Sequence, residues 1–237
     1  MRVALTGAGG FVGQALSRAL AARGHEVVPI SLRARLSTGD RDKIEGLLEP
    51  VQGCDVVINA AAAKIVRSDA DEFVNRELPA LLADLPCVGT GETRLVHISS
   101  MNVSIPALGD PYTLGKREAE KTLRGQPATI VRPGLIWSFS EGDAERAIRL
   151  FRGPLPIIAL PWPGNSYRPL MVDSFADWLC DTLELGLQAE TIAVLGDTEL
   201  TMWLLLKDLA RRQGARVIPV PTAWLANPIP PLARILS

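Results

Sequence analysis

The sequence predicts an α/β protein with a doubly wound parallel sheet and a small C-terminal lobe. Three observations lead to this fold class. In the first half of the chain, short apolar runs alternate with segments whose apolar residues recur at helical spacing. A glycine-rich loop stands between the first apolar run and the first helical segment. After about residue 135 the alternation gives way to a proline-rich stretch at residues 153–169.

The expected strands are short apolar runs, as in sheets that are covered on both faces. Gly24 should end the first helix, and Asp110 followed by Pro111 should begin a later one, because Asp caps a helix and Pro suits its first turn. The expected strands are residues 2–6, 26–32, 55–59, 95–99 and 128–132. The expected helices are residues 12–23, 42–48 and 71–84, and one that begins after residue 110.

Residues 1–135 are expected to form the sheet domain and residues 136–237 the smaller lobe. Within the lobe, residues 153–169 are expected to form an irregular loop. A helix over residues 173–187 and a strand over residues 192–195 are expected to return to the sheet domain, so that the range 173–196 belongs to it. A further helix is expected over residues 201–212. The apolar tail, residues 219–237, could cover the lobe or join two copies in a homodimer.

Composition narrows the classes of function. With 47% apolar and 22% charged residues the chain is globular, and its net charge of −1 makes nucleic acid a poor partner. Its three cysteines and two histidines form neither a disulfide framework nor a zinc pattern, so no metal is expected. Neither a signal peptide nor a run of about 18 apolar residues is seen, which predicts a soluble, cytoplasmic protein without membrane contact.

The glycine-rich loop places Gly7, Gly10 and Gly13 three residues apart. Small residues let the backbone approach a pyrophosphate, and the helix that follows offers free N–H groups and the positive end of its dipole. The spacing differs from G-x-G-x-x-G, but the order of strand, loop and helix is that of a dinucleotide site. The alternative is an ordinary glycine-rich turn. The loop therefore predicts a Rossmann-type domain that binds NAD or NADP.

Tyr112 and Lys116 lie four residues apart on a predicted helix and therefore share one face. A nearby ammonium favours the phenolate, which should lower the pKa of Tyr112 and make it a usable acid or base for a carbonyl/alcohol pair. Ser100 follows a predicted strand, at the edge where open α/β sheets bind ligands, and its hydroxyl could orient the carbonyl oxygen. Ser99 is the fallback for that role.

With these motifs the sequence resembles the extended, nucleotide-sugar-modifying branch of the short-chain dehydrogenase/reductase superfamily, the NAD-dependent epimerase/dehydratase family. The resemblance implies that Ser100, Tyr112 and Lys116 are the catalytic triad and that Ser100 also contacts the substrate. It rests on the glycine loop and on five further stretches: Asp55 to Ala62, Val74-Asn75, Ser99 to Val103, Tyr112 to Lys116, and Arg132 to Gly134.

The same resemblance implies which residues hold the cofactor. They come from the glycine loop, the end of the second strand, the small residues after the next strand, and the catalytic helix. The expected cofactor-binding residues are Gly7, Gly10, Phe11, Val12, Gly13, Ser31, Arg33, Asp40, Ala60, Ala61, Ala62, Lys64, Asn75, Tyr112, Lys116 and Pro133.

Two basic residues have less usual matches in this family. Arg168 is similar to an arginine that grips the substrate diphosphate in nucleotide-sugar members, a role that suits its fork of donors. The alternative is a surface arginine in a proline-rich loop. Lys64 resembles a lysine that some sugar epimerases place near the cofactor phosphates, and the alternative is a solvated surface lysine.

The chain also departs from the family pattern. Between Arg33 and Asp40 there is hardly room for the third strand that most extended members have. This short connection, like the run at residues 57–62, is similar to dTDP-4-keto-rhamnose reductases. The lobe that would recognise the sugar is shorter than in typical nucleotide-sugar enzymes.

The end of the second strand bears on the choice of dinucleotide. NAD-binding proteins place an acid there for the ribose 2′-hydroxyl, whereas this chain has Ser31, with Arg33 and Arg35 close behind. A missing acid with nearby arginines favours a 2′-phosphate, so NADP is preferred over NAD. The alternative is that both arginines face solvent.

These observations predict an NAD(P)H-dependent reductase or dehydrogenase that acts on a keto/hydroxyl group of a small-molecule sugar, nucleotide-linked by the resemblance. An epimerase or dehydratase that retains NAD⁺ uses the same triad and is the first alternative. A non-catalytic, cofactor-sensing protein on the same fold is the second. His97, inside an apolar strand, is expected to pack rather than take part in chemistry.

Overall fold

The computed structural model describes residues 1–32, 46, 48–138, 157–162, 166–186, 190–212 and 214–221. The chain divides into two compact units, Met1–Gly134 with Val172–Val194, and Leu135–Met171 with Leu195–Ser237. The predicted helix at residues 42–48 falls almost entirely outside the described residues, as do Arg33, Arg35, Asp40 and most of the C-terminal tail. Within the described residues, no helix is both long enough and apolar enough to cross a membrane.

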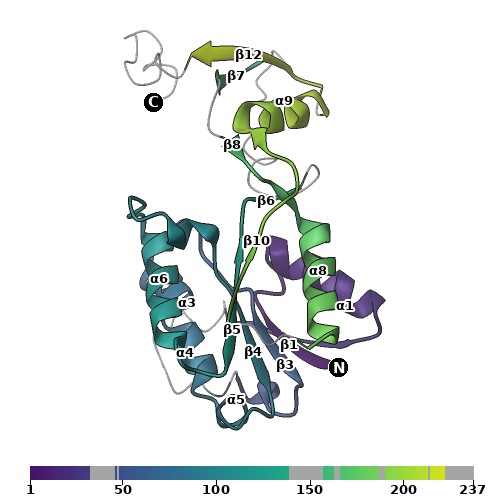
Figure 1. Cartoon of the computed structure of the whole chain (residues 1–237), viewed down its shortest axis with the longest axis vertical. Coiled ribbons are helices and arrows are strands. Elements are labelled where there is room, and N and C mark those ends of the chain that lie inside the picture. Colours follow the sequence, from purple (N-terminus) through teal and green to yellow (C-terminus); the bar gives the residue numbers. More distant parts are fainter. Residues whose placement is uncertain are drawn as a thin grey trace. The chain divides into compact units, whose positions relative to one another are not determined.

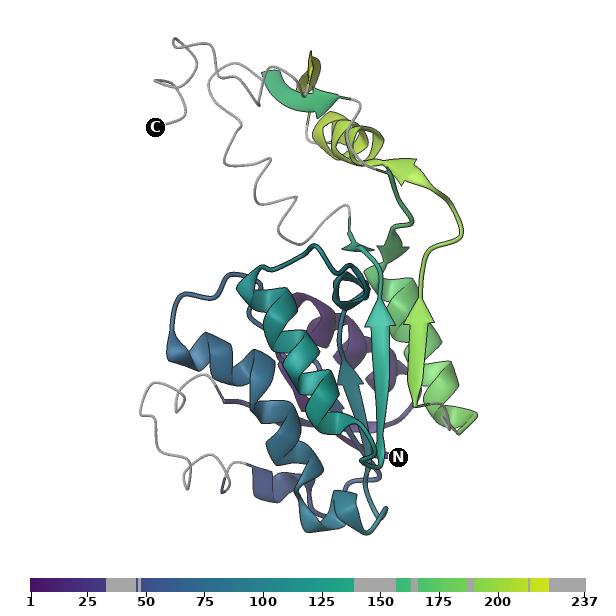
Figure 2. The same ribbon diagram turned by 60° about the vertical axis from the view of Figure 1, so that its left-hand side comes forward.

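The first unit is built on a six-stranded sheet in which every pairing is parallel. Its strand order, β2-β1-β3-β4-β5-β10, confirms the predicted doubly wound α/β class. Figures 1 and 2 show β5 and β10, which lie far apart in the sequence, side by side in the same direction. The strands are β1 (Arg2–Thr6), β2 (Glu26–Ile30), β3 (Val56–Asn59), β4 (Arg94–Ile98), β5 (Ala128–Pro133) and β10 (Thr191–Val194).

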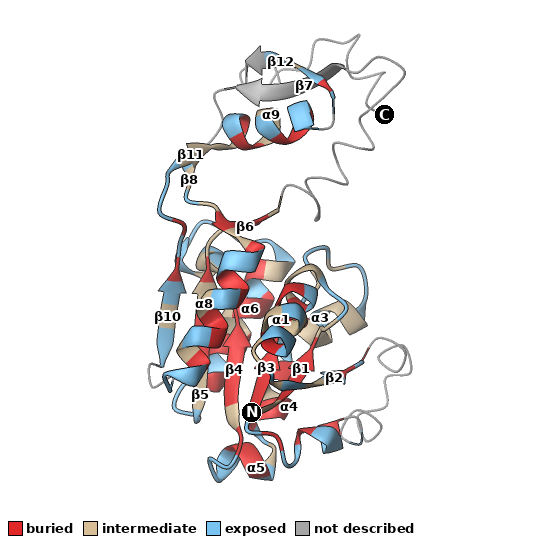
Figure 3. Cartoon of the chain, turned by 90° about the vertical axis from the view of Figure 1, so that its right-hand side faces the viewer, coloured by how far each residue is buried: buried red, intermediate tan, exposed pale blue. Residues whose placement is uncertain are grey.

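Helices cover both faces of this sheet (Figure 1). On one face lie α1 (Phe11–Ala22) and α8 (Val172–Glu184), and on the other α3 (Asp69–Arg76), α4 (Leu78–Ala83) and α6 (Pro111–Leu123). The shorter helical segments of this unit are η2 (Glu49–Val51), α5 (Pro86–Gly89) and η3 (Met101–Ser104). The central strands β1, β3 and β4 are buried between the two helical layers, which explains their uninterrupted apolar runs (Figure 3).

The single helix predicted over residues 71–84 is wrong, because the structure has two helices separated at Glu77. Pro79 lies in the first turn of α4, where its missing N–H is tolerated. In one continuous helix the same residue could not donate to the carbonyl of Asn75, and its ring would clash there. The chain therefore begins a new helix whose apolar face, including Leu78 and Leu82, enters the core.

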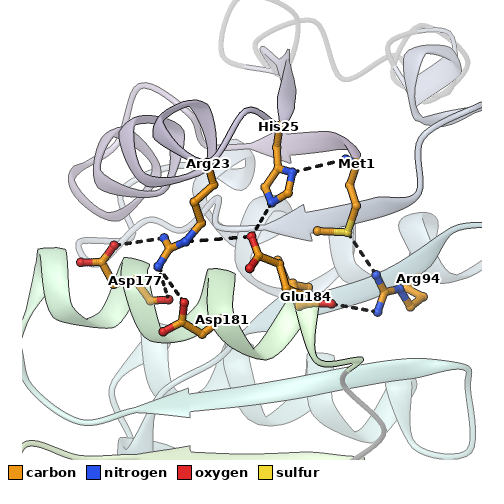
Figure 4. Close-up of polar contacts among 8 residues, drawn as sticks. Met1, Arg23, His25, Arg94, Asp177, Asp181 and Glu184 are labelled. Carbon is orange, nitrogen blue, oxygen red and sulfur yellow. Dashed lines mark hydrogen bonds and ion pairs between the residues drawn. The ribbon is translucent and has the colours of Figure 1, made fainter.

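The return of α8 to the sheet domain is secured by polar contacts with the end of α1 (Figure 4). Arg23 donates to Asp177 over 3.0 Å and to Asp181 over 2.7 Å, while His25 lies 2.9 Å from Glu184. These acids recur every three or four residues and share one face of α8. Apolar residues on the opposite side of α8, among them Phe175 and Leu179, are fully buried. Helix α8 follows the proline-rich stretch in the sequence but belongs to the first unit.

In the part of the second unit that the structure describes, there are three two-stranded sheets and one long helix. The irregular loop predicted over residues 153–169 is wrong, since β7 (Ile157–Trp162) and β8 (Ser166–Tyr167) lie there. Pro161 is tolerated in β7 because both strands of a two-stranded sheet are edge strands, which leave half of their N–H groups unpaired. The other elements are β6 (Ile136–Trp137), β9 (Leu170–Met171), β11 (Leu200–Thr201), α9 (Met202–Arg212) and β12 (Arg216–Pro221).

Candidate active site

The carboxyl ends of β1 and β3 lie side by side at the switch point of the sheet. From β1 the chain continues outward to β2, whereas β3 begins the opposite half of the sheet. The connections that leave two such strands diverge to opposite faces and open a crevice, where open α/β sheets bind ligands. The glycine loop follows β1 and residues 60–63 follow β3, so both border this crevice.

The glycine loop leaves no room for side chains at two of its three predicted positions. Gly7 has a φ of +69°, and a Cβ on it would lie 2.7 Å from the backbone of Ala61. A Cβ on Gly13 would lie 2.0 Å from the carbonyl oxygen of Gly7. The loop is closed by a hydrogen bond of 2.8 Å from the N–H of Gly10 to the same carbonyl. Close backbone contacts therefore require glycine at these positions, with Ala61 after β3 at Gly7 and within the loop at Gly13.

The loop leads directly into the N-terminus of α1. Gly10 is the N-cap residue, and no side chain caps the helix or places an acid in its first turn. The first N–H groups of a helix have no partner within it and carry the positive end of its dipole. The predicted residues Phe11, Val12 and Gly13 form this first turn. Such an end favours an anion such as a pyrophosphate.

A cavity of about 580 Å³ lies at this crevice, a size typical of ligand sites. Its lining combines glycine-loop backbone with an apolar wall, and Ser31 and Asp71 contribute polar groups. The Asp71 carboxylate is held by the Ser68 hydroxyl and the Arg67 N–H, which lower the pKa of this acid. The lining residues are Gly7, Ala8, Gly9, Gly10, Pro29, Ile30, Ser31, Leu32, Ala60, Ala61, Ala62, Ala63, Ile65, Ala70, Asp71 and Val74.

Asn75 supports the wall of this cavity from α3. Its side-chain oxygen accepts from the N–H of Ala63 over 3.0 Å, and its amide donates to the carbonyl of Ala63 over 2.8 Å. Gly115 allows α6 to approach, because a Cβ there would lie 2.9 Å from the Cβ of Asn75. The amide of this predicted cofactor residue is therefore already engaged by the backbone beside the cavity.

A row of polar side chains crosses the sheet behind the cavity. Thr6, Asn59 and His97 are in register on β1, β3 and β4. Thr6 donates to the Asn59 oxygen over 2.6 Å, so the Asn59 amide faces Nδ1 of His97 over 3.1 Å. Burial and the charge of Lys116 hold the pKa of His97 well below its usual value, so the ring is neutral and its proton is on Nε2. Within the part of the chain that the structure describes, Nε2 has no hydrogen-bond partner.

Tyr112 and Ser100 lie together where α6 begins, beside the carboxyl end of β4. Ser100 also caps the η3 turn by accepting from the N–H of Asn102 over 3.2 Å. Burial raises the pKa of Tyr112 more than the hydrogen bond from Ser100 lowers it. The prediction that this pKa is lowered is therefore wrong for this structure. The Lys116 ammonium donates to a backbone carbonyl, and its charge is not among the influences on the tyrosine.

Lys116 is fully buried, with 1% of its surface exposed. Its Nζ donates to the carbonyl of Ile98, the last residue of β4, over 2.8 Å. Burial lowers the pKa of Lys116 from its usual 10.5 to about 7, and the carboxylate of Glu120 opposes this shift. An amine with that pKa is only partly protonated at neutral pH.

The two candidate serines have different environments. Ser99 is buried and donates to the Glu120 carboxylate over 2.6 Å, whereas Ser100 is half-buried and lies by Tyr112. Successive residues of an extended chain point in opposite directions, so only one of the pair can face the tyrosine. The geometry favours Ser100 for contact with a substrate.

The remaining predicted residues are dispersed. Lys64 is exposed between two cavity-lining residues, and Pro133 ends β5. Arg168 belongs to the second unit, where it donates to the carbonyl of Asp197 over 3.2 Å. The sequence did not predict that the apolar side chains of Ile65 and Val74 line the cavity. Their spacing indicates only a helix and the segment that leads into it.

Comparison with known proteins identifies the family. Residues 1–127 match the model of the RmlD substrate binding domain family. A curated relative, the 2-alkyl-3-oxoalkanoate reductase of Stenotrophomonas maltophilia, is 28% identical over 184 residues, which are 63% of this chain. The chain spans about half the length of that relative, namely 54%.

Solved structures share the fold at low sequence identity. The dTDP-4-dehydrorhamnose reductase of Clostridium acetobutylicum has a TM-score of 0.76 at 16% identity, over 93% of this chain and 83% of the other. The enzyme of the same name from Bacillus anthracis, solved with NADP, has a TM-score of 0.75 at 18% identity, over 94% and 85% of the two chains. The family match confirms the resemblance found in the motifs, and this chain belongs to the RmlD substrate binding domain family, on a Rossmann-type α/β fold.

Proposed function

We propose that this chain is an NAD(P)H-dependent reductase of a keto group, with a nucleotide-linked keto sugar as its substrate. The observation that carries the proposal is the arrangement at one edge of the sheet. The glycine cradle and uncapped α1 lie at the ends of the central strands, and Ser100, Tyr112 and Lys116 lie beside the end of the neighbouring β4. The family match and the reductases among the relatives support the same reading.

The residues present fit a dinucleotide. Gly7 and Gly13 leave space that a Cβ would fill, the first turn of α1 offers N–H groups to a pyrophosphate, and the cavity wall next to them is apolar. When bound, the cofactor supplies the hydride. Lys116 would contact its ribose, and Ser31 would face the second ribose from the end of β2.

The protein's own groups would handle the proton. Tyr112, whose raised pKa keeps it protonated at neutral pH, donates its phenolic proton to the substrate oxygen as the carbonyl becomes an alcohol. Ser100 donates a hydrogen bond to that oxygen and fixes its position. A tyrosine that rests in its acid form suits the reductive direction.

One experiment tests the activity. The purified chain is incubated with NADPH or NADH and a panel of ketones, and the loss of absorbance at the nicotinamide band is followed. The panel contains a dTDP-linked 4-keto sugar and a 2-alkyl-3-oxo acid, because the names of the relatives indicate these two classes. Consumption of NAD(P)H with the nucleotide sugar is expected. Tightly retained NAD⁺ without net consumption would instead indicate an epimerase or dehydratase, and cofactor binding without turnover of any ketone a sensing protein.

Cofactor preference gives a separate prediction. Replacing Arg33 with alanine should raise the KM for NADPH about tenfold or more while changing the KM for NADH little, because a hydrogen bond to a charged group contributes about 1.5–3 kcal/mol. The prediction rests on the residue that follows β2 and lines the cavity, which is Ser31 and not the acid that would bind a ribose 2′-hydroxyl. Initial rates with both cofactors measure the effect. Equal changes for NADPH and NADH would show that Arg33 does not contact a 2′-phosphate.

A further inference from the structure

Glu120 lies on α6, and side chains from two strands of the first unit hold its carboxylate in position. Its carboxylate accepts from the Ser99 hydroxyl over 2.6 Å at the end of β4. It also receives both arms of the Arg132 guanidinium from β5, with 2.9 Å between Nε and Oε1 and a second contact from Nη2 to Oε2. The carboxylate is almost fully buried, since Glu120 is 7% exposed. Such a bidentate pair fixes the orientation as well as the location of the charge.

Lys116 lies one helical turn before Glu120 on the same face of α6. The groups that act on the amine come from each element around it. On β4, His97 is neutral and the Ile98 carbonyl accepts a hydrogen bond. Arg132 on β5 pairs with the Glu120 carboxylate. Glu120 favours the protonated amine against the cost of burial.

Stability alone is a weak reason for this arrangement. A buried ion pair contributes little net free energy of folding, because the cost of removing two charges from water offsets their attraction. The Glu120 carboxylate nevertheless favours the protonated form of Lys116, since a fixed charge in a medium of low dielectric acts strongly on its neighbour. The fully buried amine would otherwise be neutral under ordinary conditions.

We propose that Glu120 is a positioning residue that keeps the buried Lys116 amine protonated, and that Ser99 and Arg132 hold its carboxylate for this task. The inference deepens the proposed function and rests on it, because a charged Lys116 matters for binding the cofactor ribose. It also gives Ser99 a role different from that of Ser100.

The test measures NADPH affinity by fluorescence between pH 6 and pH 9.5, which requires no substrate. In the wild type, affinity should fall as Lys116 loses its proton, beginning near its pKa of about 7. The Lys116→Met variant should lack this alkaline decrease, which separates it from the titration of the cofactor phosphate. In Glu120→Gln, which keeps shape and neutral hydrogen bonding, the decrease should begin about one pH unit lower, because an opposite charge is removed.

Arg132→Gln keeps the charge of Glu120 but removes the guanidinium that orients its carboxylate. The decrease should therefore also move to lower pH, by less than in Glu120→Gln, whereas loss of a purely structural ion pair would weaken binding by the same factor at every pH and leave the midpoint unchanged. Ser99→Ala removes one hydrogen bond to the same carboxylate and should move the midpoint in the same direction by about 0.3 pH units. Should Glu120→Gln not fold, as judged by circular dichroism, the downward shift in Arg132→Gln decides the question.

The outcomes separate the two proposals. A wild type that binds neither NADPH nor NADH would overturn the proposed function. A wild type whose decrease depends on Lys116, but whose midpoint is unchanged in both Glu120→Gln and Arg132→Gln, would overturn the role of Glu120 while leaving the reductase assignment intact.

Discussion

Replacing Gly13 with alanine is expected to weaken NADPH binding at least about a hundredfold, which corresponds to about 3 kcal/mol of forced repacking. The added Cβ would lie 2.0 Å from the carbonyl oxygen of Gly7, so either the loop or the start of α1 must move. Both present N–H groups at the site proposed for the pyrophosphate. A fluorescence titration with NADPH measures the loss, and thermal unfolding reports the accompanying decrease in Tm.

Gly9 offers a matched control in the same loop. A Cβ on Gly9 would meet no heavy atom within 4 Å, and its φ lies outside the left-handed region. Gly9→Ala should therefore keep the wild-type fold and Tm. If Gly13→Ala binds NADPH as tightly as the wild type, the glycine loop is not the seat of the dinucleotide.

Replacing Tyr112 with phenylalanine is expected to lower kcat about 10²- to 10⁴-fold, the usual contribution of a positioned acid or base. The substitution removes the proposed proton donor beside Ser100, while the ring remains to fill its half-buried position. NADPH affinity should change only a few-fold. Turnover of the keto substrate and fluorescence binding, measured on the same preparation, separate the two effects.

The other tyrosine of the chain is a convenient control for this substitution. Tyr167 lies in β8 of the second unit and on none of the elements that carry the triad, and Tyr167→Phe should retain turnover. Persisting turnover in Tyr112→Phe would mean that another group supplies the proton, and the acid/base assignment would have to be withdrawn.

Much of the first unit could be predicted because its signals are local. Strand β1 occupies the predicted residues 2–6, and β5 extends the predicted strand by one residue. Asp110 caps α6 by accepting from the N–H of Thr113, as the Asp-Pro pair predicts. Apolar runs and capping residues act within a few positions of the chain, so they need no knowledge of the fold.

Errors arose where local signals compete. Pro79 lies inside a stretch of helical spacing and divides it into α3 and α4, because the backbone hydrogen bond that it lacks outweighs the pattern. In the second unit, prolines suggested a loop over residues 153–169, yet β7 pairs there with the distant β12. A pairing partner almost 60 residues away leaves no mark on the local sequence.

The sequence by itself determined the class of fold, the glycine cradle and the spacing of Tyr112 and Lys116, because these depend on residue type and short-range order. Only the tertiary structure decided which serine faces Tyr112, that the pKa of Tyr112 is raised rather than lowered, and that Glu120 acts on Lys116. Ionisation depends on burial and on charges brought in by other strands and helices. Those distances exist only once the sheet and its covering helices have assembled.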